Sequence, residues 1–190
     1  MTPNRLEAFS DGVLAIIITI MVLELKAPTE GADLFYLLPL IPKFLFYLLS
    51  FIYIGIYWNN HHHLFKATKR VNGLVLWANL ALLFFLSLIP FTTSWMGEYV
   101  LDEHPASLYG INLLCCAISF MILEKMVIKA EGEESVVSFA LEDQRKEKGS
   151  LALYILGIVF SFIYTPIAMI CYALVALLWL MPDRRLEKNL

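Results

Sequence analysis

The chain has 190 residues, of which 59% are hydrophobic and only 16% are charged, and its formal net charge is −3. Soluble domains carry about 25% charged residues, and a soluble fold of this length could not bury so much apolar surface. The composition therefore excludes a soluble globular protein. It predicts an all-α polytopic membrane protein with a single domain, residues 1–190.

Six apolar segments in chain order predict six transmembrane helices. The first three are expected at about residues 3–25, 37–63 and 71–96. Pro3 suits the start of a helix, and Pro90 is expected to kink the third helix or to end its regular part.

The C-terminal half holds the other three predicted helices. The fourth is expected at about residues 106–128, and a polar cytoplasmic linker follows over 129–148. The last apolar block, 151–181, would be about 46 Å long as one helix, whereas the hydrocarbon core is only about 30 Å thick. We therefore expect the Thr165-Pro166 step to divide this block into helices at about 150–164 and 166–182.

Lysine and arginine residues are unevenly distributed among the connecting segments. With the N-terminus inside, all 14 of them except Lys26 and Lys43 fall on the cytoplasmic side. This bias is what the positive-inside rule requires. The sequence therefore predicts that both termini are cytoplasmic.

The first predicted helix begins with strongly polar side chains in the string RLEAFSDG. Arg5, Ser10 and Asp11 are costly in lipid unless they meet partners inside a bundle or face water, so we expect this helix to belong to the protein interior. Farther along, four residues share one helical face: Ile16, Thr19, Ile20 and Leu23. This face is suited to line a pathway, although periodicity alone favours ordinary packing or lipid contact.

Two further polar clusters are expected at the same depth as Arg5 and Asp11. They are YWNNHHHLFK at the end of the second helix and LWANL near the start of the third. Asp11 could accept a hydrogen bond from an imidazole, from the Trp77 indole or from the Asn79 amide. Consecutive histidines on a helix point about 100° apart, so the HHH string cannot bind one metal ion, and no metal site is expected.

Glu24 lies at the outer end of the first helix. In a symmetric oligomer a ring of Glu24 would attract cations to a pore mouth, but a simple solvated carboxylate fits the sequence as well. The three cysteines have no CxxC or paired spacing. Neither a disulfide framework nor a zinc site is therefore expected.

The motif RxxxFSD, which is followed by LELKAP, YWNNHHHLF and LWANLALLFFLSLIPF, resembles the endosomal/lysosomal potassium channel family, transmembrane protein 175. The resemblance is to its bacterial members in particular, which carry one six-helix repeat. It implies that four copies surround one pore lined by the first helix of each. The matching filter positions are Ile16, Thr19 or Ile20, and Leu23. The matching structural network comprises Arg5, Phe9, Ser10 and Asp11, with partners among His62, His63, Trp77 and Asn79.

The sequence thus predicts a homotetrameric potassium leak channel of the bacterial plasma membrane, permeable to K⁺ and other monovalent cations. A TVGYG-like loop is absent, so we expect a hydrophobic filter with weak selectivity for K⁺ over Na⁺. Its partners are further copies of itself and the lipid bilayer, with neither a cofactor nor nucleic acid. The alternative is a proton- or cation-coupled carrier that uses the His/Asp cluster. An enzyme is not expected, because this cluster lacks a nucleophile and metal-ligand spacing.

Overall fold

The computed structural model describes residues 2–29, 31–132, 135, 137–138 and 144–180. These residues form helices without any strand, which confirms the all-α prediction. In chain order the helices are α1 (Pro3–Leu23), the 3₁₀ helix η1 (Leu34–Leu40), α2 (Ile41–Ala67), α3 (Gly73–Ser87), α4 (Ile89–Glu98), α5 (Glu103–Glu131), α7 (Arg145–Ser161) and α8 (Thr165–Leu180).

Within the described ranges, four helical stretches are long and apolar enough to cross a membrane. They are Pro3–Leu23, Leu34–Ala67, Gly73–Glu98 and Glu103–Glu131, and Thr165–Leu180 is a shorter apolar helix. The chain is therefore built as a polytopic membrane protein.

Proline divides the helices where the sequence predicts it. The third predicted helix consists of α3 and α4, with Pro90 in the first turn of α4. In the first turn of a helix the backbone N–H has no carbonyl partner within the same helix. A proline there, which lacks this N–H, therefore loses no hydrogen bond. The last apolar block is also divided, but slightly earlier than expected: α7 ends at Ser161 rather than 164, and α8 begins at Thr165, so the Thr165-Pro166 step is the start of α8.

Several helices extend beyond their apolar segments, and here the predicted boundaries are corrected. The second helical stretch, which consists of η1 and α2, begins at Leu34 rather than 37 and ends at Ala67 rather than 63. Likewise α5 starts and ends three residues outside 106–128, and α7 begins at Arg145 instead of 150. The predicted linker at 129–148 is therefore helical at both ends. Residues 133–134, 136, 139–143 and 181–182 of the predicted segments lie outside the described part.

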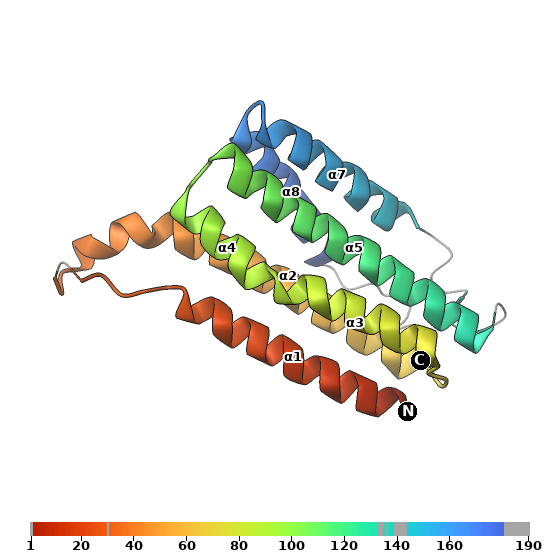
Figure 1. Cartoon of the computed structure of the whole chain (residues 1–190). Helices are drawn as coiled ribbons and strands as arrows, with labels where there is room; N and C mark the ends of the chain where they lie inside the picture. Colours follow the sequence, from red (N-terminus) through yellow and green to blue (C-terminus); the bar gives the residue numbers. More distant parts are fainter. Residues whose placement is uncertain (1, 30, 133–134, 136, 139–143, 181–190) are drawn as a thin grey trace.

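The helices lie side by side in a slanted bundle, with α1 along one edge and α7 and α8 along the opposite edge (Figure 1). Helix α1 packs against α2, α3 and α4, whereas α5 packs against α3 on one side and α7 on the other. Because α1 lies at an edge, only part of its circumference is covered by its own chain.

Four buried tyrosines join α2, α5, α7 and α8 in the core: Tyr53, Tyr109, Tyr154 and Tyr172. The Tyr53 hydroxyl donates to the Tyr172 carbonyl at 2.6 Å, and the Tyr172 hydroxyl donates to the Ala106 carbonyl at 3.2 Å. Partnered hydroxyls let large rings fill an apolar core without the cost of an unsatisfied polar group.

Gly110 of α5 is the point where the Tyr172 ring approaches the backbone. A Cβ atom at Gly110 would lie 1.9 Å from the Tyr172 hydroxyl oxygen, whereas nothing lies within 4 Å of a Cβ at Gly55 of α2. We expect Gly110→Ala to destabilise the fold by about 1–3 kcal/mol or more through overpacking. Gly55→Ala is expected to be neutral or stabilising by about 0.5–1 kcal/mol. Thermal unfolding of the two variants in detergent would compare them, and equal melting temperatures would contradict this packing.

Candidate functional site

Helix α1 has one face buried against the bundle and one face open. The buried side chains recur every three or four residues, as one helical face requires: Leu6, Ser10, Leu14, Ile17 and Met21. The predicted pore residues lie on the other side. Ile16 is 59% exposed and Leu23 is 74% exposed, and Thr19 and Ile20 are also exposed. The structure therefore gathers the predicted filter residues on a face that its own chain leaves uncovered.

Thr19 is the hydroxyl residue on this uncovered face. Its Oγ1 donates to the Ile16 carbonyl at 2.8 Å, within the same helix. The hydroxyl proton is thereby used inside the helix, and the oxygen lone pairs remain as acceptors. Such an oxygen can coordinate a cation without losing its own donor contact.

Glu24 follows directly after α1, half-buried beside α4. Its Oε2 accepts a hydrogen bond from the Ser94 hydroxyl at 2.8 Å. The carboxylate is thus fixed to α4 of the same chain, at the opposite end of α1 from Ser10 and Asp11.

A buried hydrogen-bond chain fastens the first half of α1 to α2 and α3. Asn79 Nδ2 donates to Ser10 Oγ at 3.0 Å, and Ser10 Oγ donates to the Leu6 carbonyl at 3.0 Å. Asn79 Oδ1 lies 2.8 Å from His61 Nε2. An amide oxygen only accepts, so His61 must carry its proton on Nε2. The chain therefore runs in one direction, from α2 through α3 to the backbone of α1.

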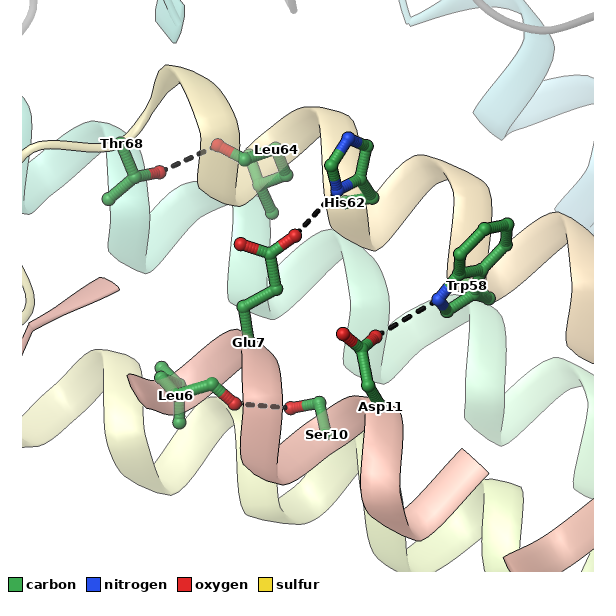
Figure 2. A network of polar contacts seen from close by, with 8 residues as sticks. All are labelled: Leu6, Glu7, Ser10, Asp11, Trp58, His62, Leu64 and Thr68. Atoms are coloured by element: carbon green, nitrogen blue, oxygen red, sulfur yellow. Dashed lines mark hydrogen bonds and ion pairs between the residues drawn. The ribbon is translucent and has the colours of Figure 1, made fainter. Parts of the chain in front are cut away.

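A second set of contacts joins α1 directly to α2, one turn apart on each helix (Figure 2). Trp58 Nε1 donates to Asp11 Oδ1 at 3.0 Å, and His62 Nδ1 lies 2.5 Å from Glu7 Oε1. The Trp58 and His62 rings stack with centroids 6.4 Å apart. Two carboxylates of α1 thus face two ring N–H groups of α2, and contacts of this type to a charged partner are the stronger ones.

The network differs from the sequence expectation in its partners. Asp11 binds Trp58 instead of an imidazole, Trp77 or Asn79, and Asn79 binds Ser10 instead. His62 takes part, but through Glu7. Sequence reasoning missed Trp58, Glu7 and His61 as members, although all three lie within the quoted strings RLEAFSD and YWNNHHHLF.

The remaining predicted network residues lie outside these contacts. Trp77 is 74% exposed, and Phe9 and Arg5 are exposed as well. Within the described ranges, the Arg5 side chain forms no ion pair and the Trp77 indole N–H no hydrogen bond. The His63 ring is half-buried, with its centroid 5.6 Å from that of His62. No group of three His, Cys, Asp or Glu residues in the described part could hold a metal ion.

Asp11→Ala is expected to leave the Trp58 indole N–H without its acceptor. Hydrogen bonds to a charged group contribute about 1.5–3 kcal/mol, so the melting temperature should fall and the packing of α1 on α2 should loosen. A double-mutant cycle with Trp58→Phe would measure this contact, because the two losses should be less than additive. Additive losses would show that Asp11 and Trp58 do not interact.

Comparison with known proteins places this geometry in a family. The model of the endosomal/lysosomal potassium channel TMEM175 family matches residues 5–90, which include α1 from Arg5 onward, the basic α2–α3 connection and the whole network. A potassium channel from Chryseobacterium sp. (strain P1-3) is 57% identical over 190 residues, covering 100% of this chain and 98% of the relative. A potassium channel from Streptomyces collinus is 30% identical over 192 residues. This match covers 92% of this chain and 89% of the relative.

The fold agrees with a solved structure of the same family. The crystal structure of a lysosomal potassium-selective channel TMEM175 homolog from Chamaesiphon minutus matches with a TM-score of 0.83 and 30% identity. The match covers 95% of this chain and 97% of that one. The family is one of ion channels and not of enzymes. Sequence identity along the full length, the shared fold and the RxxxFSD motif on α1 together show that this chain belongs to the TMEM175 family.

Proposed function

We propose that this chain is the subunit of a potassium-permeable channel in the bacterial plasma membrane, with the uncovered face of α1 as the pore wall. The observation that carries the proposal is the division of α1 into two faces. One face is fastened to α2 and α3 by polar contacts, of which the one between Ser10 and Asn79 is buried, and the other presents Ile16, Thr19, Ile20 and Leu23. Relatives that match most of this chain in sequence are named potassium channels.

A single uncovered helix face cannot enclose an ion pathway, so the proposal requires several copies. Closed cyclic symmetry brings the same face of each copy to one axis. We propose four copies, with the α1 helices innermost. In that arrangement α1, which lies at the edge of a single chain, becomes the centre of the assembly (Figure 1).

Selectivity in such a pore would come from side chains rather than from a cage of carbonyls. Ile16 and Leu23 would each form a narrow apolar ring that resists ions by excluding water. An ion must shed part of its hydration to pass such a ring. K⁺ holds water less tightly than Na⁺, which favours K⁺ modestly. The Thr19 oxygens, whose protons are used within the helix, are proposed to replace some of the lost water.

The polar contacts are proposed to hold the pore wall in register. Glu7, Ser10 and Asp11 lie within little more than one turn of α1 and fix it against two neighbouring helices. At the other end, the contact between Glu24 and Ser94 is proposed to hold a carboxylate at the pore mouth, where several copies would concentrate cations. The distribution of lysine and arginine supports cytoplasmic termini.

The direct test is electrical recording from purified protein in planar bilayers under a K⁺/Na⁺ gradient. We expect currents whose reversal potential is shifted from zero toward the K⁺ equilibrium potential. The K⁺/Na⁺ permeability ratio should be well below that of carbonyl filters. Saturating flux coupled to a proton gradient, without unitary currents, would instead support the carrier alternative.

A further inference from the structure

The α2–α3 connection, together with the last turn of α2 that carries Lys66, presents three cations close together. Lys66, Lys69 and Arg70 are all exposed, within five residues of one another in the sequence. None of these side chains forms an ion pair with a carboxylate in the part of the chain that the structure describes. A short, concentrated positive charge is therefore displayed in a protein whose overall charge is −3.

Hydrogen bonds at three points fix the backbone of this connection. Glu131 at the end of α5 accepts hydrogen bonds from the backbone N–H groups of Lys69, at 2.7 Å, and Arg70. Thr68 Oγ1 donates to the Leu64 carbonyl at 2.7 Å (Figure 2), and Asn72 Oδ1 accepts from Val75 N at 3.0 Å as the cap of α3. The carboxylate of Glu131 is used on the backbone, so the three cationic side chains are left free above a fixed loop.

The surface next to this loop is apolar. Leu74 and Trp77 lie on the first turns of α3, one turn apart, and both are more than half exposed. Tryptophan at such a position is typical of the membrane–water interface, where the ring lies at the level of the headgroups. A fixed basic loop thus lies above an exposed apolar surface, at the end of two membrane-spanning helices.

We propose that the α2–α3 connection is a binding site for the headgroup of an anionic phospholipid of the phosphatidylglycerol type. The Arg70 guanidinium matches two oxygens of the phosphodiester, and Lys66 and Lys69 add point charges beside it. The acyl chains lie along Leu74 and Trp77. Soluble phosphate lacks these chains, so the site is one for membrane lipid. Lys125 and Lys129, exposed near the same end of α5, add to the positive potential.

Lipid bound here acts on the helices that fasten α1. The connection joins α2, which carries His61 and His62, to α3, which carries Asn79. Neutralising the repulsion among three neighbouring cations stabilises the loop and, with it, the relative position of these two helices. The binding itself does not depend on ion conduction, so it can be tested separately from channel activity.

Native mass spectrometry of the purified full-length protein, titrated with phosphatidylglycerol or with phosphatidylethanolamine, tests the proposal. A juxtamembrane cation contributes about fivefold in affinity for an anionic surface, so removing three should weaken phosphatidylglycerol binding by about 100-fold. The variant is Lys66→Gln, Lys69→Gln and Arg70→Gln together. The matched control, Lys66→Arg, Lys69→Arg and Arg70→Lys, keeps the charge and should keep most of the affinity. Lys26→Gln, exposed at the opposite end, should have no effect.

Two results would overturn the proposal. The first is that the wild-type protein binds phosphatidylglycerol no better than phosphatidylethanolamine. This comparison does not depend on the folding of any variant. The second is unchanged phosphatidylglycerol affinity in the triple glutamine variant, or in Arg70→Gln alone, for which a fivefold loss is expected. Competition by inorganic phosphate at concentrations similar to the lipid would likewise exclude a lipid site, because the acyl chains would then contribute nothing.

Discussion

Asn79→Leu is expected to be the most damaging single substitution in the polar network. The leucine leaves the His61 Nε2–H without an acceptor and the Ser10 hydroxyl without its donor, and both side chains are buried. The unsatisfied His61 N–H costs about 1–3 kcal/mol, and the hydrogen bond lost at Ser10, which still donates to the Leu6 carbonyl, costs about 0.5–1.5 kcal/mol, so a total of about 1.5–4.5 kcal/mol is expected. The variant should show a much lower melting temperature in detergent and little or no K⁺ flux in liposomes.

A matched control shows whether the destabilisation by Asn79→Leu comes from its hydrogen bonds or from replacing an asparagine by leucine as such. Asn59, half-buried on α2, makes no side-chain hydrogen bond with a described residue, and Asn59→Leu should change the melting temperature little. Combining Asn79→Leu with Ser10→Ala and His61→Phe should restore part of the lost stability, because partners removed together leave fewer unsatisfied groups. A triple variant less stable than Asn79→Leu alone would contradict the hydrogen-bond chain.

Ile16→Asn is expected to have the largest effect on permeation. In the proposed assembly it replaces a ring of apolar side chains by a ring of amides, which hold water in the constriction and lower the dewetting barrier. A change of about 1.4 kcal/mol in that barrier changes conductance about tenfold. Leu23→Asn should act in the same direction. Single-channel recording in planar bilayers would measure conductance and the K⁺/Na⁺ permeability ratio.

The control for this prediction is Ile170→Asn on α8. Ile170 is 58% exposed, nearly the same as Ile16 at 59%, but it lies on a helix at the opposite edge of the bundle. The same chemical change there should leave conductance and selectivity unchanged in those channels that assemble. Equal effects of the two substitutions, or none from either Ile16→Asn or Leu23→Asn, would remove α1 from the pore wall.

The two faces of α1 could be predicted from sequence because both follow from helical periodicity. Ile16, Thr19, Ile20 and Leu23 share a face by spacing alone, and the structure leaves that face uncovered. The divisions near Pro90 and Pro166 could also be predicted, because proline restricts the backbone locally. These features depend on neighbours in sequence and need no knowledge of the tertiary packing.

The hydrogen-bond partners could not be predicted, because they depend on how α2 is rotated about its axis. The sequence places an indole and three imidazoles near the level of Asp11, and all of them can donate. In the structure His61 points to Asn79 of α3, and His62 points to Glu7 of α1. Adjacent residues on a helix differ by about 100°, so the rotation of α2 about its axis decides which imidazole meets which partner, and the sequence does not specify that rotation.

Helix ends were predicted less well than helix identity. The hydrophobic segments mark the part of each helix that lies in the membrane, whereas helical hydrogen bonding continues into the polar flanks. Helix α7 begins at Arg145 because RKEKGS contains lysine, arginine and glutamate, which have high helix propensity. Hydropathy therefore underestimates the length of such helices.

The central claim is that the open face of α1 lines the ion pathway, and cysteine accessibility tests it most directly. The Leu23→Cys variant and, as a control, the Ile163→Cys variant would be purified and reconstituted into liposomes. Both would then be treated with a water-soluble cationic thiol reagent. Leu23 is 74% exposed and Ile163 71% exposed in a single chain, so exposure alone does not distinguish them. We expect the reagent to block K⁺ current through Leu23→Cys channels and to leave Ile163→Cys channels unaffected. Full current through modified Leu23→Cys channels, with the modification verified by mass, would contradict the account.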